Sequence, residues 1–401
     1  MTSPTGTTST IAWPPTVATT LPADAADATL VGRVMTAAGP AVVTVRDERL
    51  VDLTGSFATT SELAEHPDPA AAVRAADGPD LGSLADVLAR TPVELRSDDG
   101  VRLLSPIDLQ AVKAAGVTFA VSMVERVIEE RCQGDAARAE EMRAQITGLI
   151  GADLGELTPG SPETDRLKEA LVAAGSWSQY LEVGLGPDAE IFTKTTTMAS
   201  VGTGVDVGIH PRSQWNNPEP EVVVLVSSTG SIRGATLGND VNLRDFEGRS
   251  ALLLGKAKDN NASAALGPFV RLFDDGFSLD DVRRIEVGLD VVGTDGFHLT
   301  GSSSMSLISR DPADLVGQLM GPTHQYPDGA VLFLGTMFAP VQDRDAVGQG
   351  FTHHVDDLVA VTAERLGGLV NRVRTSEACE PWTFGAGALM RNLASRGLLT
   401  G

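Results

Sequence analysis

The sequence predicts a strand-rich α+β protein, because apolar and β-branched runs follow one another with few helices between them. The clearest runs span residues 222–227, 284–292 and 330–334, each bounded by Gly, Asp or Asn. The chain has 401 residues, 42% of them hydrophobic and 21% charged, which is typical of a globular protein. A chain of this length can bury a substantial core in one large domain or two modest ones.

The chain divides into four segments by composition. Residues 1–27 are rich in Thr, Ala and Pro without periodicity, and predict a flexible leader. Residues 28–105 begin with short alternating runs separated by turns and continue into helical segments, which predicts a smaller N-terminal α/β domain. We expect a larger β-rich domain over residues 106–375 and a C-terminal tail over residues 376–401.

Within the larger domain, apolar residues spaced three and four positions apart predict helices at 121–150 and 161–183. From Glu190 onward the sequence becomes strand-like. Two shorter helices are expected to interrupt these strands, one at 261–273 and one at 312–320.

Charge and cysteine content exclude several classes of partner. The 31 basic and 53 acidic residues give a net charge of −22, which repels phosphate backbones and anionic lipid, so nucleic acid and membranes are poor partners. Cys132 and Cys379 fit neither a disulfide framework nor a metal-ligand spacing, which indicates a reduced environment. The N-terminus does not resemble a secretory signal and no apolar run is long enough to span a bilayer. We therefore expect a cytoplasmic protein.

Two other motifs are weak. The glycines of residues 202–208 do not have the spacing of a dinucleotide-binding loop. His353 and His354 are adjacent, and adjacent side chains of a strand point to opposite faces, so they are poor candidates for one metal ion.

A pair of glutamates opens the most strand-like run. Glu219 and Glu221 flank Pro220, and residues i and i+2 of a strand share a face with Cα atoms about 6.5 Å apart. Two carboxylates this close need solvent, basic partners or a cation. Mg²⁺ and Mn²⁺ favour carboxylate oxygens, and Asp240, in a Gly-Asn-Asp turn, supplies a third. Because charge clusters are more often solvated surface, these residues alone leave both interpretations open.

The order of motifs over about residues 110–375 resembles the fumarylacetoacetate hydrolase superfamily. The matching motifs are Glu219-Pro220-Glu221, Asn239-Asp240 followed by Arg244-Asp245, Lys258 ahead of Gly267-Pro268, Phe192-Thr193-Lys194 with Ser200-Val201-Gly202, Gly301 to Met305, and Leu334-Gly335-Thr336. The resemblance implies a rolled mixed β-sheet and a Mg²⁺ ion, with Mn²⁺ as the alternative, held by Glu219, Glu221 and Asp240. If Lys258 is not the superfamily's lysine, Lys256 is the second candidate.

One departure from the superfamily pattern bears on the reaction. Hydrolytic members have a Gly-Leu-Asn-Tyr-x-x-His-x-x-Glu segment whose His and Glu activate water, whereas this chain has Ser122 in the His position and keeps Glu125. A serine hydroxyl is not a base near neutral pH without an activator. The segment is similar instead to the branch that dehydrates 2-keto-3-deoxy sugar acids.

The resemblance therefore implies a Mg²⁺-dependent hydro-lyase that converts 2-keto-3-deoxypentonate to 2,5-dioxopentanoate and water in oxidative pentose catabolism, and that works as a homo-dimer or homo-tetramer. Glu125 and Lys258 would be catalytic, and Lys258 would have a lowered pKa. Arg244 with Asp245 would brace the Asp240 turn. Contacts to the small 2-oxo acid substrate would come from Thr336, Gly335, Ser122, Lys194 and Asn260.

Alternatives remain at this stage. A hydrolase of 2,4-dioxo acids, which cleaves a C–C bond as acylpyruvate hydrolases do, would use Glu125 and water without a histidine. A non-catalytic binder of oxo acids would keep the fold alone. Glu125 would otherwise belong to a solvated helix face, and Lys258 to a structural ion pair.

Overall fold

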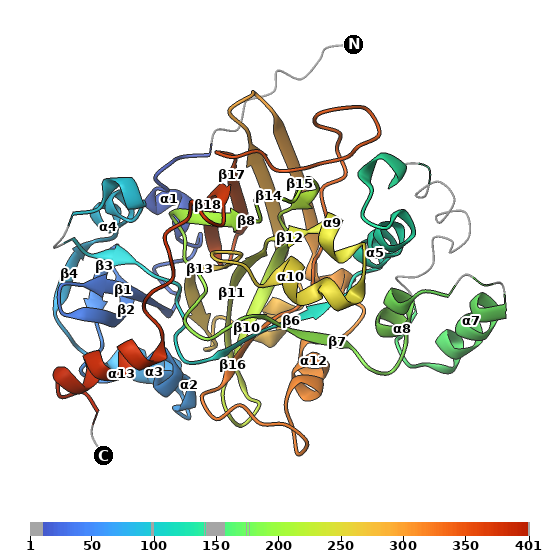
Figure 1. The fold of residues 1–401 in the computed structure, drawn as a ribbon. Helices are drawn as coiled ribbons and strands as arrows, with labels where there is room; N and C mark the ends of the chain where they lie inside the picture. The colour runs from blue at the N-terminus through green and yellow to red at the C-terminus, as the bar shows by residue number, and fades with distance from the viewer. Residues whose placement is uncertain are drawn as a thin grey trace, which may run out of the picture.

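The computed structural model describes residues 11–97, 100–139, 141, 157–173, 175 and 177–399. Two mixed sheets, one of 11 strands and one of five, form the centre of this part of the chain, and helices lie around them (Figure 1). This arrangement confirms the strand-rich α+β class. No helix in the described ranges is both long and apolar enough to cross a membrane.

The large sheet has one continuous strand order. The order is β4 (Asp80–Ser83), β3 (Arg49–Asp52), β2 (Gly39–Arg46), β1 (Leu30–Thr36), β13 (Ala264–Leu272), β11 (Ile232–Asp240), β10 (Pro220–Val226), β16 (Ala330–Phe333), β6 (Ala111–Gly116) and β7 (Glu190–Thr195), with β5 (Arg102–Leu103) paired to β1. The second sheet has the order β15 (His298–Ser304), β14 (Glu286–Val292), β17 (Leu358–Ala363), β18 (Gly367–Thr375) and β8 (Val205–Ile209). A short pair joins β12 (Asn242–Leu243) to β9 (Asn216–Asn217).

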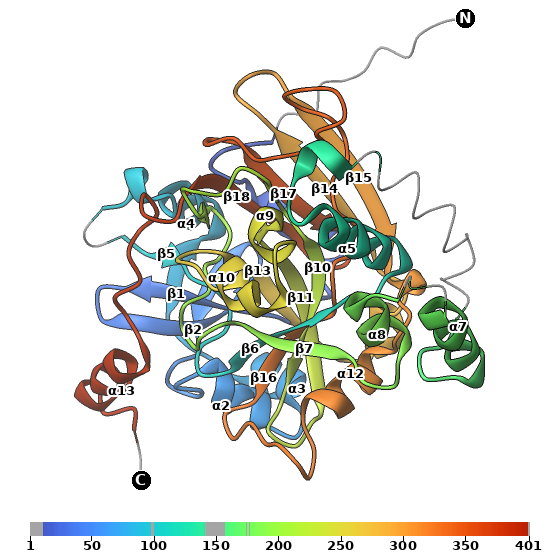
Figure 2. The ribbon, with the colours of Figure 1, turned by 45° about the vertical axis from the view of Figure 1, so that its right-hand side comes forward.

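The described helices are short and lie at the periphery. They are α1 (Val17–Thr20), α2 (Thr60–Glu65), α3 (Pro69–Ala75), α4 (Leu84–Arg90), α5 (Ala120–Cys132), α7 (Pro162–Ala173), α8 (Gln179–Leu185), α9 (Arg244–Glu247), α10 (Leu254–Lys258), α11 (Leu279–Val282), α12 (Pro312–Leu319) and α13 (Ala386–Ser395). Helices α5, α7 and α8 lie at one end of the molecule, and α13 lies with β1–β4 at the other (Figure 2).

Strand β10 lies at the centre of the core. All seven of its residues are buried, which explains why it reads as a continuous apolar run rather than an alternating one. Val222 and Val224 pack in the same cluster as Leu289 of the second sheet, whereas Val223 packs in a cluster with Leu63 of α2. The strand that carries the glutamate pair is therefore covered on both faces.

The strands of residues 28–105 continue the large sheet. Strand β1 pairs antiparallel with β13 through Leu30 and Val31. Residues 11–27, which we expected to be a loose leader, also pack against the body of the protein, because Asp24 forms an ion pair with the buried Arg271 at 2.6 Å. Residues 1–10 lie outside the described part of the chain.

The helix expected at 261–273 is wrong, since this segment forms β13 (Ala264–Leu272). Its run of alanines favours a helix, but Gly267-Pro268 cannot sit inside one. All nine residues are buried between β1 and β11, where small side chains allow close packing on both faces.

The other helices expected in the larger domain are confirmed in part. Helix α5 ends at Cys132, and a turn and a short 3₁₀ segment follow it at 133–138, so the helix expected over 121–150 is wrong there. The segment 161–183 holds two helices, α7 and α8, and α12 covers the expected 312–320 except for its last residue. Residues 140 and 142–156 lie outside the described ranges.

Candidate metal centre

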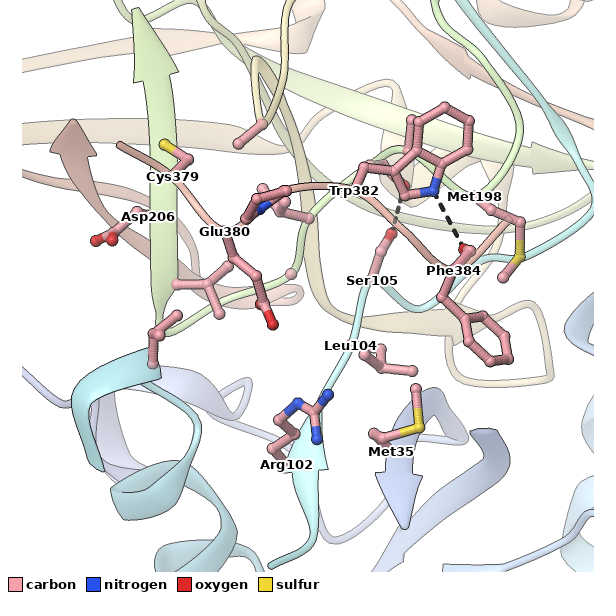
Figure 3. Close-up of a pocket in the computed structure, with 18 of the residues that line it drawn as sticks. Met35, Arg102, Leu104, Ser105, Met198, Asp206, Cys379, Glu380, Trp382 and Phe384 are labelled. Atoms are coloured by element: carbon pink, nitrogen blue, oxygen red, sulfur yellow. Dashed lines mark hydrogen bonds between the residues drawn. The ribbon is translucent and has the colours of Figure 1, made fainter. Parts of the chain in front are cut away.

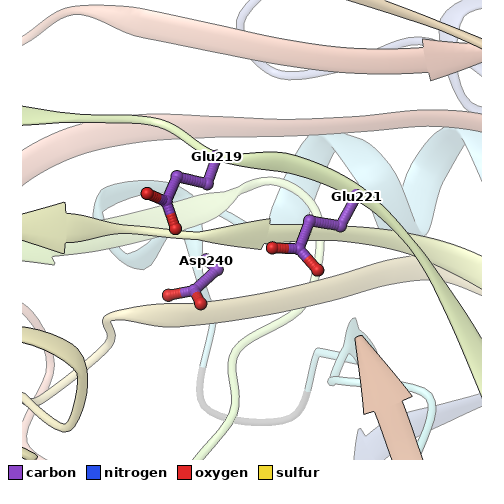
Figure 4. A group of neighbouring side chains, drawn as sticks. All are labelled: Glu219, Glu221 and Asp240. Carbon is purple, nitrogen blue, oxygen red and sulfur yellow. The ribbon is translucent and has the colours of Figure 1, made fainter. Parts of the chain in front are cut away.

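Three carboxylates converge where β10 and β11 meet. Glu219 directly precedes β10, Glu221 lies in it, and Asp240 ends β11. The two strands are antiparallel with Pro220 opposite Asn239, which places Asp240 beside Glu219, and the Asp240 amide donates to the Glu219 carbonyl at 3.0 Å. One oxygen of each carboxylate lies within 4.8 Å of the others. Figure 4 shows the three side chains close to one another on neighbouring strands.

These carboxylates are fully buried and have unequal partners. The Lys258 ammonium lies 2.5 Å from Glu219 Oε2 and 3.2 Å from Asp240 Oδ2. Arg126 of α5 also donates to Glu219. Glu221, in contrast, accepts hydrogen bonds from the Gly335 amide at 2.8 Å and the Thr336 hydroxyl at 3.3 Å, both of them neutral donors.

The pKa values of the two glutamates move in opposite directions. Burial, Asp240 and Glu219 together raise the pKa of Glu221 well above its usual value. Burial also acts on Glu219, but Arg126 and Lys258 outweigh it and lower the pKa of Glu219 to about 2. Among the described residues no cation contacts Glu221 directly, and Lys258 offsets its raised pKa only in part. Three buried carboxylates in this arrangement fit a hard divalent cation such as Mg²⁺ or Mn²⁺.

Lys258, rather than the second candidate Lys256, reaches the cluster. Lys258 is 2% exposed, while Lys256 is exposed to solvent. In the ion-free structure the pKa of Lys258 is raised, and the lowered pKa expected beside a metal ion stays a prediction. Burial acts to lower the pKa, but the negative charges of Asp240 and Glu219 outweigh it and raise the value. Lys258 is therefore cationic here.

A second layer of buried charge comes from α5. Arg126 Nη1 lies 2.7 Å from Glu129 Oε2 and 3.0 Å from Glu247 Oε2. Arg244 Nη2 lies 2.9 Å from Glu125 Oε2, and its Nε lies 2.5 Å from Glu129 Oε1. The alternative of a solvated helix face is thus wrong for Glu125, which is buried with its neighbours.

Sequence reasoning missed Arg126, Glu129 and Glu247 as parts of the site. Arg126 and Glu129 are three residues apart, a spacing that places both on one face of a helix. The same spacing occurs on solvent-exposed helix faces, so the sequence does not distinguish a buried network from a surface. Arg244, expected to brace the Asp240 turn, binds α5 instead and lies 4.4 Å from the ring centre of Trp215.

Glu190, at the start of β7, is a further missed group. Burial raises its pKa to about 7, and the neighbouring Glu247 adds to the shift. Burial likewise raises the pKa of Glu247. Nothing in the local sequence marks either glutamate, because both environments depend on packing between distant segments.

The other three residues expected to contact the substrate differ in whether they reach the carboxylate cluster. Lys194 is completely buried, with its ammonium 2.9 Å from Asp240 Oδ1, and burial lowers its pKa. Ser122 donates to the Phe119 carbonyl at 2.9 Å, and the Asn260 amide donates to the Lys256 carbonyl at 3.0 Å. Of these three residues, only Lys194 contacts a cluster carboxylate within the described structure.

The adjacent histidines have separate surroundings, as expected. His353 is buried, with Nδ1 3.2 Å from Asp357, whereas His354 is half-buried and its ring nitrogens lie 3.3 Å from Asp295 and 3.0 Å from Asp345. They do not form a common site.

Comparison with known proteins gives two curated relatives. No family model matches the chain. The chain is 28% identical over 185 residues to 2-dehydro-3-deoxy-D-arabinonate dehydratase of Saccharolobus solfataricus, and 30% identical over 196 residues to a probable 2-keto-3-deoxyxylonate dehydratase of Haloferax volcanii. The matches cover 46% and 49% of this chain, and 58% and 64% of the relatives, less than two thirds of either.

Solved structures extend the comparison to most of the chain. The apo form of 2-keto-3-deoxy-D-arabinonate dehydratase aligns over 86% of this chain and 99% of its own, with a TM-score of 0.60 and 19% identity. The chain has the fold of that dehydratase. A structure of the dehydratase complexed with magnesium and 2,5-dioxopentanoate gives the same TM-score and coverage at 20% identity. The dehydratase fold confirms the architecture expected from the resemblance.

Proposed function

We propose that the protein is a Mg²⁺-dependent hydro-lyase that removes water from a 2-keto-3-deoxypentonate to give 2,5-dioxopentanoate. The observation that carries this proposal is the buried convergence of Glu219, Glu221 and Asp240 with Lys258. The names of the two curated relatives support the substrate class. The neighbour complexed with magnesium and 2,5-dioxopentanoate supports the ion and the product.

The three carboxylates would hold the ion, with Mn²⁺ as the alternative to Mg²⁺. When bound, the ion supplies Lewis acidity to the 2-oxo group of the substrate, which makes a C3 proton easier to remove. The Gly335 amide and Thr336 hydroxyl fix the orientation of Glu221. They also mark the side of the cluster on which we place the substrate carboxylate.

Lys258 and Glu125 would carry the proton chemistry. Because Lys258 is cationic and lies against Glu219 and Asp240, we assign it to donating a hydrogen bond to the substrate oxygen that gains negative charge. Glu125, held by Arg244, would take the C3 proton and return one to the C4 hydroxyl, which leaves as water. The 5-hydroxy-2-oxopent-3-enoate formed in this way would become 2,5-dioxopentanoate by tautomerisation, in which protons leave C5 and its hydroxyl and protons are added at C3 and C4. Lys194 would keep Asp240 in place, while Ser122 and Asn260 remain proposals for contacts to substrate hydroxyls.

The serine at position 122 favours dehydration over hydrolysis. Its hydroxyl donates to the helix backbone, so it is not directed at activating a water molecule. Removal of water from a 3-deoxy acid needs no nucleophile, only a base at C3 and an acid at C4. The residues of α5 thus fit the lyase better than the C–C hydrolase.

The direct test is to incubate the purified protein and Mg²⁺ separately with 2-keto-3-deoxyarabinonate, 2-keto-3-deoxyxylonate and acetylpyruvate. We expect ¹H NMR to show the aldehyde proton of 2,5-dioxopentanoate from at least one pentonate, and no acetate from acetylpyruvate. Cleavage of acetylpyruvate without pentonate turnover would replace the proposal with the hydrolase. Stabilisation by pyruvate and Mg²⁺ without any turnover would indicate a non-catalytic binder.

We also propose that the protein acts in the cytoplasm as a homo-oligomer, a dimer or tetramer, in oxidative pentose catabolism. Its acidic net charge of −22 supports a small-molecule substrate rather than nucleic acid or membrane as its partner. Sedimentation equilibrium measures the oligomeric state directly.

A further inference from the structure

A cavity of about 280 Å³ lies away from the carboxylate cluster. Its walls come from β1, from residues 102–105 and 198–206, and from the C-terminal segment 379–384 (Figure 3). Met35, Leu104, Met198, Trp382 and Phe384 give it a largely apolar lining. None of the three candidate metal ligands lines it, so the cavity is a separate site.

Most charged groups in this cavity are paired with each other. Arg96 lies 2.6 Å from Glu380, and Asp206 lies 2.7 Å from Arg372. Glu380 and Asp206 are thus each paired with an arginine of the same region. Neither carboxylate therefore indicates a cation-binding site in this cavity.

Arg102 is the exception. Its guanidinium makes no hydrogen bond or ion pair with any residue that the structure describes, a set that leaves out Asp98 and Asp99. It points into the cavity between Met35 and Leu104 (Figure 3). Burial lowers its pKa, the nearby Arg96 adds to this effect, and Glu380 opposes it. A half-buried guanidinium with no partner in the described part of the chain is free to bind an anion that enters the cavity.

Arg33 supplies a second donor. It is 4% exposed, and it shares a face of β1 with Met35, two residues further on. Its Nε lies 3.4 Å from Asp108 and its Nη1 donates to the Ile107 carbonyl at 2.5 Å. Its Nη2, however, has no hydrogen-bond partner among the described residues. The cavity therefore has a buried, unsatisfied donor in addition to the Arg102 guanidinium.

We propose that this cavity binds a small organic monocarboxylate with an apolar body. Arg102 would take the carboxylate in the paired geometry that guanidinium groups favour, with Arg33 Nη2 as an additional donor. The apolar part would lie against Met35, Met198 and Phe384. The cavity volume of about 280 Å³ is just below the range of about 300–1,000 Å³ that is typical of ligand pockets, which favours a small ligand.

The charge balance selects a monoanion. A phosphomonoester dianion would need a second uncommitted cation, but Arg96 and Arg372 are already paired with Glu380 and Asp206. These two carboxylates would also repel a second negative charge. Inorganic phosphate is therefore expected to bind weakly or not at all.

The cavity also adjoins the segment that follows Lys258. Asn261 and Ala262 line it, and the Asn261 amide donates to the carbonyls of Ser376 and Glu380 at 3.0 and 3.1 Å. The C-terminal segment that closes the cavity is thus tied to the loop next to the metal centre.

The test uses 3-phenylpropionate and its uncharged analogue 3-phenylpropanamide, titrated calorimetrically into the full-length protein with EDTA present to keep the metal centre free of ions. We expect saturable binding of the acid, no binding of the amide, and no competition by inorganic phosphate. R102M should weaken binding by at least about tenfold, equivalent to about 1.4 kcal/mol. R102K, which keeps the charge but loses the paired geometry, should fall between R102M and the wild type.

Two control variants test whether binding is specific to this cavity. R90M removes an exposed arginine of α4 and should leave binding unchanged. E221A should also leave it unchanged, since Glu221 belongs to the metal centre. Absence of saturable binding at millimolar 3-phenylpropionate, or binding that R102M does not alter, would overturn the proposal. Neither result depends on whether the protein is a dehydratase.

Discussion

Arg126 on helix α5 donates a hydrogen bond to Glu219, and so joins a peripheral helix to the strand that carries the candidate metal ligands. The same guanidinium contacts Glu129 and Glu247. One guanidinium thus contacts carboxylates from three segments of the chain, namely α5, the residues just before β10, and α9. All of them are buried, so the arrangement depends on each partner being present.

We expect R126M to destabilise the protein by about 3–5 kcal/mol, the usual cost of leaving buried charges without their partner. Urea denaturation followed by circular dichroism measures the change. R131M, which alters an exposed arginine of the same helix, should stay within about 0.5 kcal/mol of the wild type. An R126M midpoint equal to that of the wild type would contradict the assigned role.

E221A should abolish saturable Mg²⁺ binding in calorimetric titrations. Turnover should fall by at least about 100-fold, because even residues that only orient metal ligands contribute 10- to 100-fold. E286A, an exposed glutamate on β14, is the matched control and should behave as the wild type. If E221A kept both ion uptake and turnover, the carboxylate cluster would not be the metal site.

Metal binding should release a proton and strengthen as pH rises. Glu221 has a pKa raised well above 4.5 by burial, Asp240 and Glu219, and the ion must displace the proton it holds. Titrations in two buffers of different ionisation enthalpy should therefore give different apparent binding enthalpies. Equal enthalpies would contradict the proton release.

The same shift predicts how the stability of the ion-free protein depends on pH. In the folded protein Glu221 keeps its proton to a higher pH than it does in the unfolded chain. The folded state therefore becomes less stable as pH rises above 4.5 toward the pKa of Glu221 in the folded protein. The melting temperature in EDTA should therefore fall over this range. The E221Q variant, which cannot titrate, should show a smaller fall, and an identical profile would argue against Glu221 as the source.

K258A should separate turnover from ion binding. Without the ammonium, the negative charges of Glu219 and Asp240 have one neighbouring cation fewer. The affinity of the site for Mg²⁺ should therefore hold or increase. The rate constant kcat should fall by about 10²–10⁴ if Lys258 stabilises charge on the substrate. K256A, two residues earlier and exposed, is the control. Loss of Mg²⁺ binding in K258A would instead indicate a structural ion pair.

E125Q should lower kcat by about 10²–10⁴ without changing Mg²⁺ affinity, because an amide cannot transfer the proton but can still accept from Arg244. Kinetics and calorimetry on the same preparation check both parts. E163Q, on the exposed first turn of α7, should match the wild type. Normal turnover in E125Q would exclude Glu125 as the acid–base group.

The sequence predicts the carboxylate cluster well because its geometry is local. The i,i+2 spacing of Glu219 and Glu221 fixes their shared face. Asp240, expected in a turn, is instead the last residue of β11, and the antiparallel pairing of β11 with β10 brings it beside Glu219. Lys258 has no such local signal and was identified through the superfamily pattern. The strand-rich fold follows from the same long apolar runs.

The errors share a physical cause. The buried network of Arg126, Glu129 and Glu247 looks like a solvated surface in sequence, because only tertiary packing of α5 against α9 removes it from water. Segment 264–272 has helix-favouring alanines, yet its place between two strands decides its structure.

Because β1 pairs with β13, the strands of residues 28–105 occupy an edge of β13 that would otherwise be unpaired. A truncated chain that began at residue 106 would expose an edge of β13 and separate Arg271 from Asp24. Uncovered strand edges recruit strands from other molecules, so such a fragment should self-associate instead of remaining in solution as a smaller folded unit. The region that supplies no candidate metal ligand would then prove essential for obtaining the carboxylate cluster in soluble form.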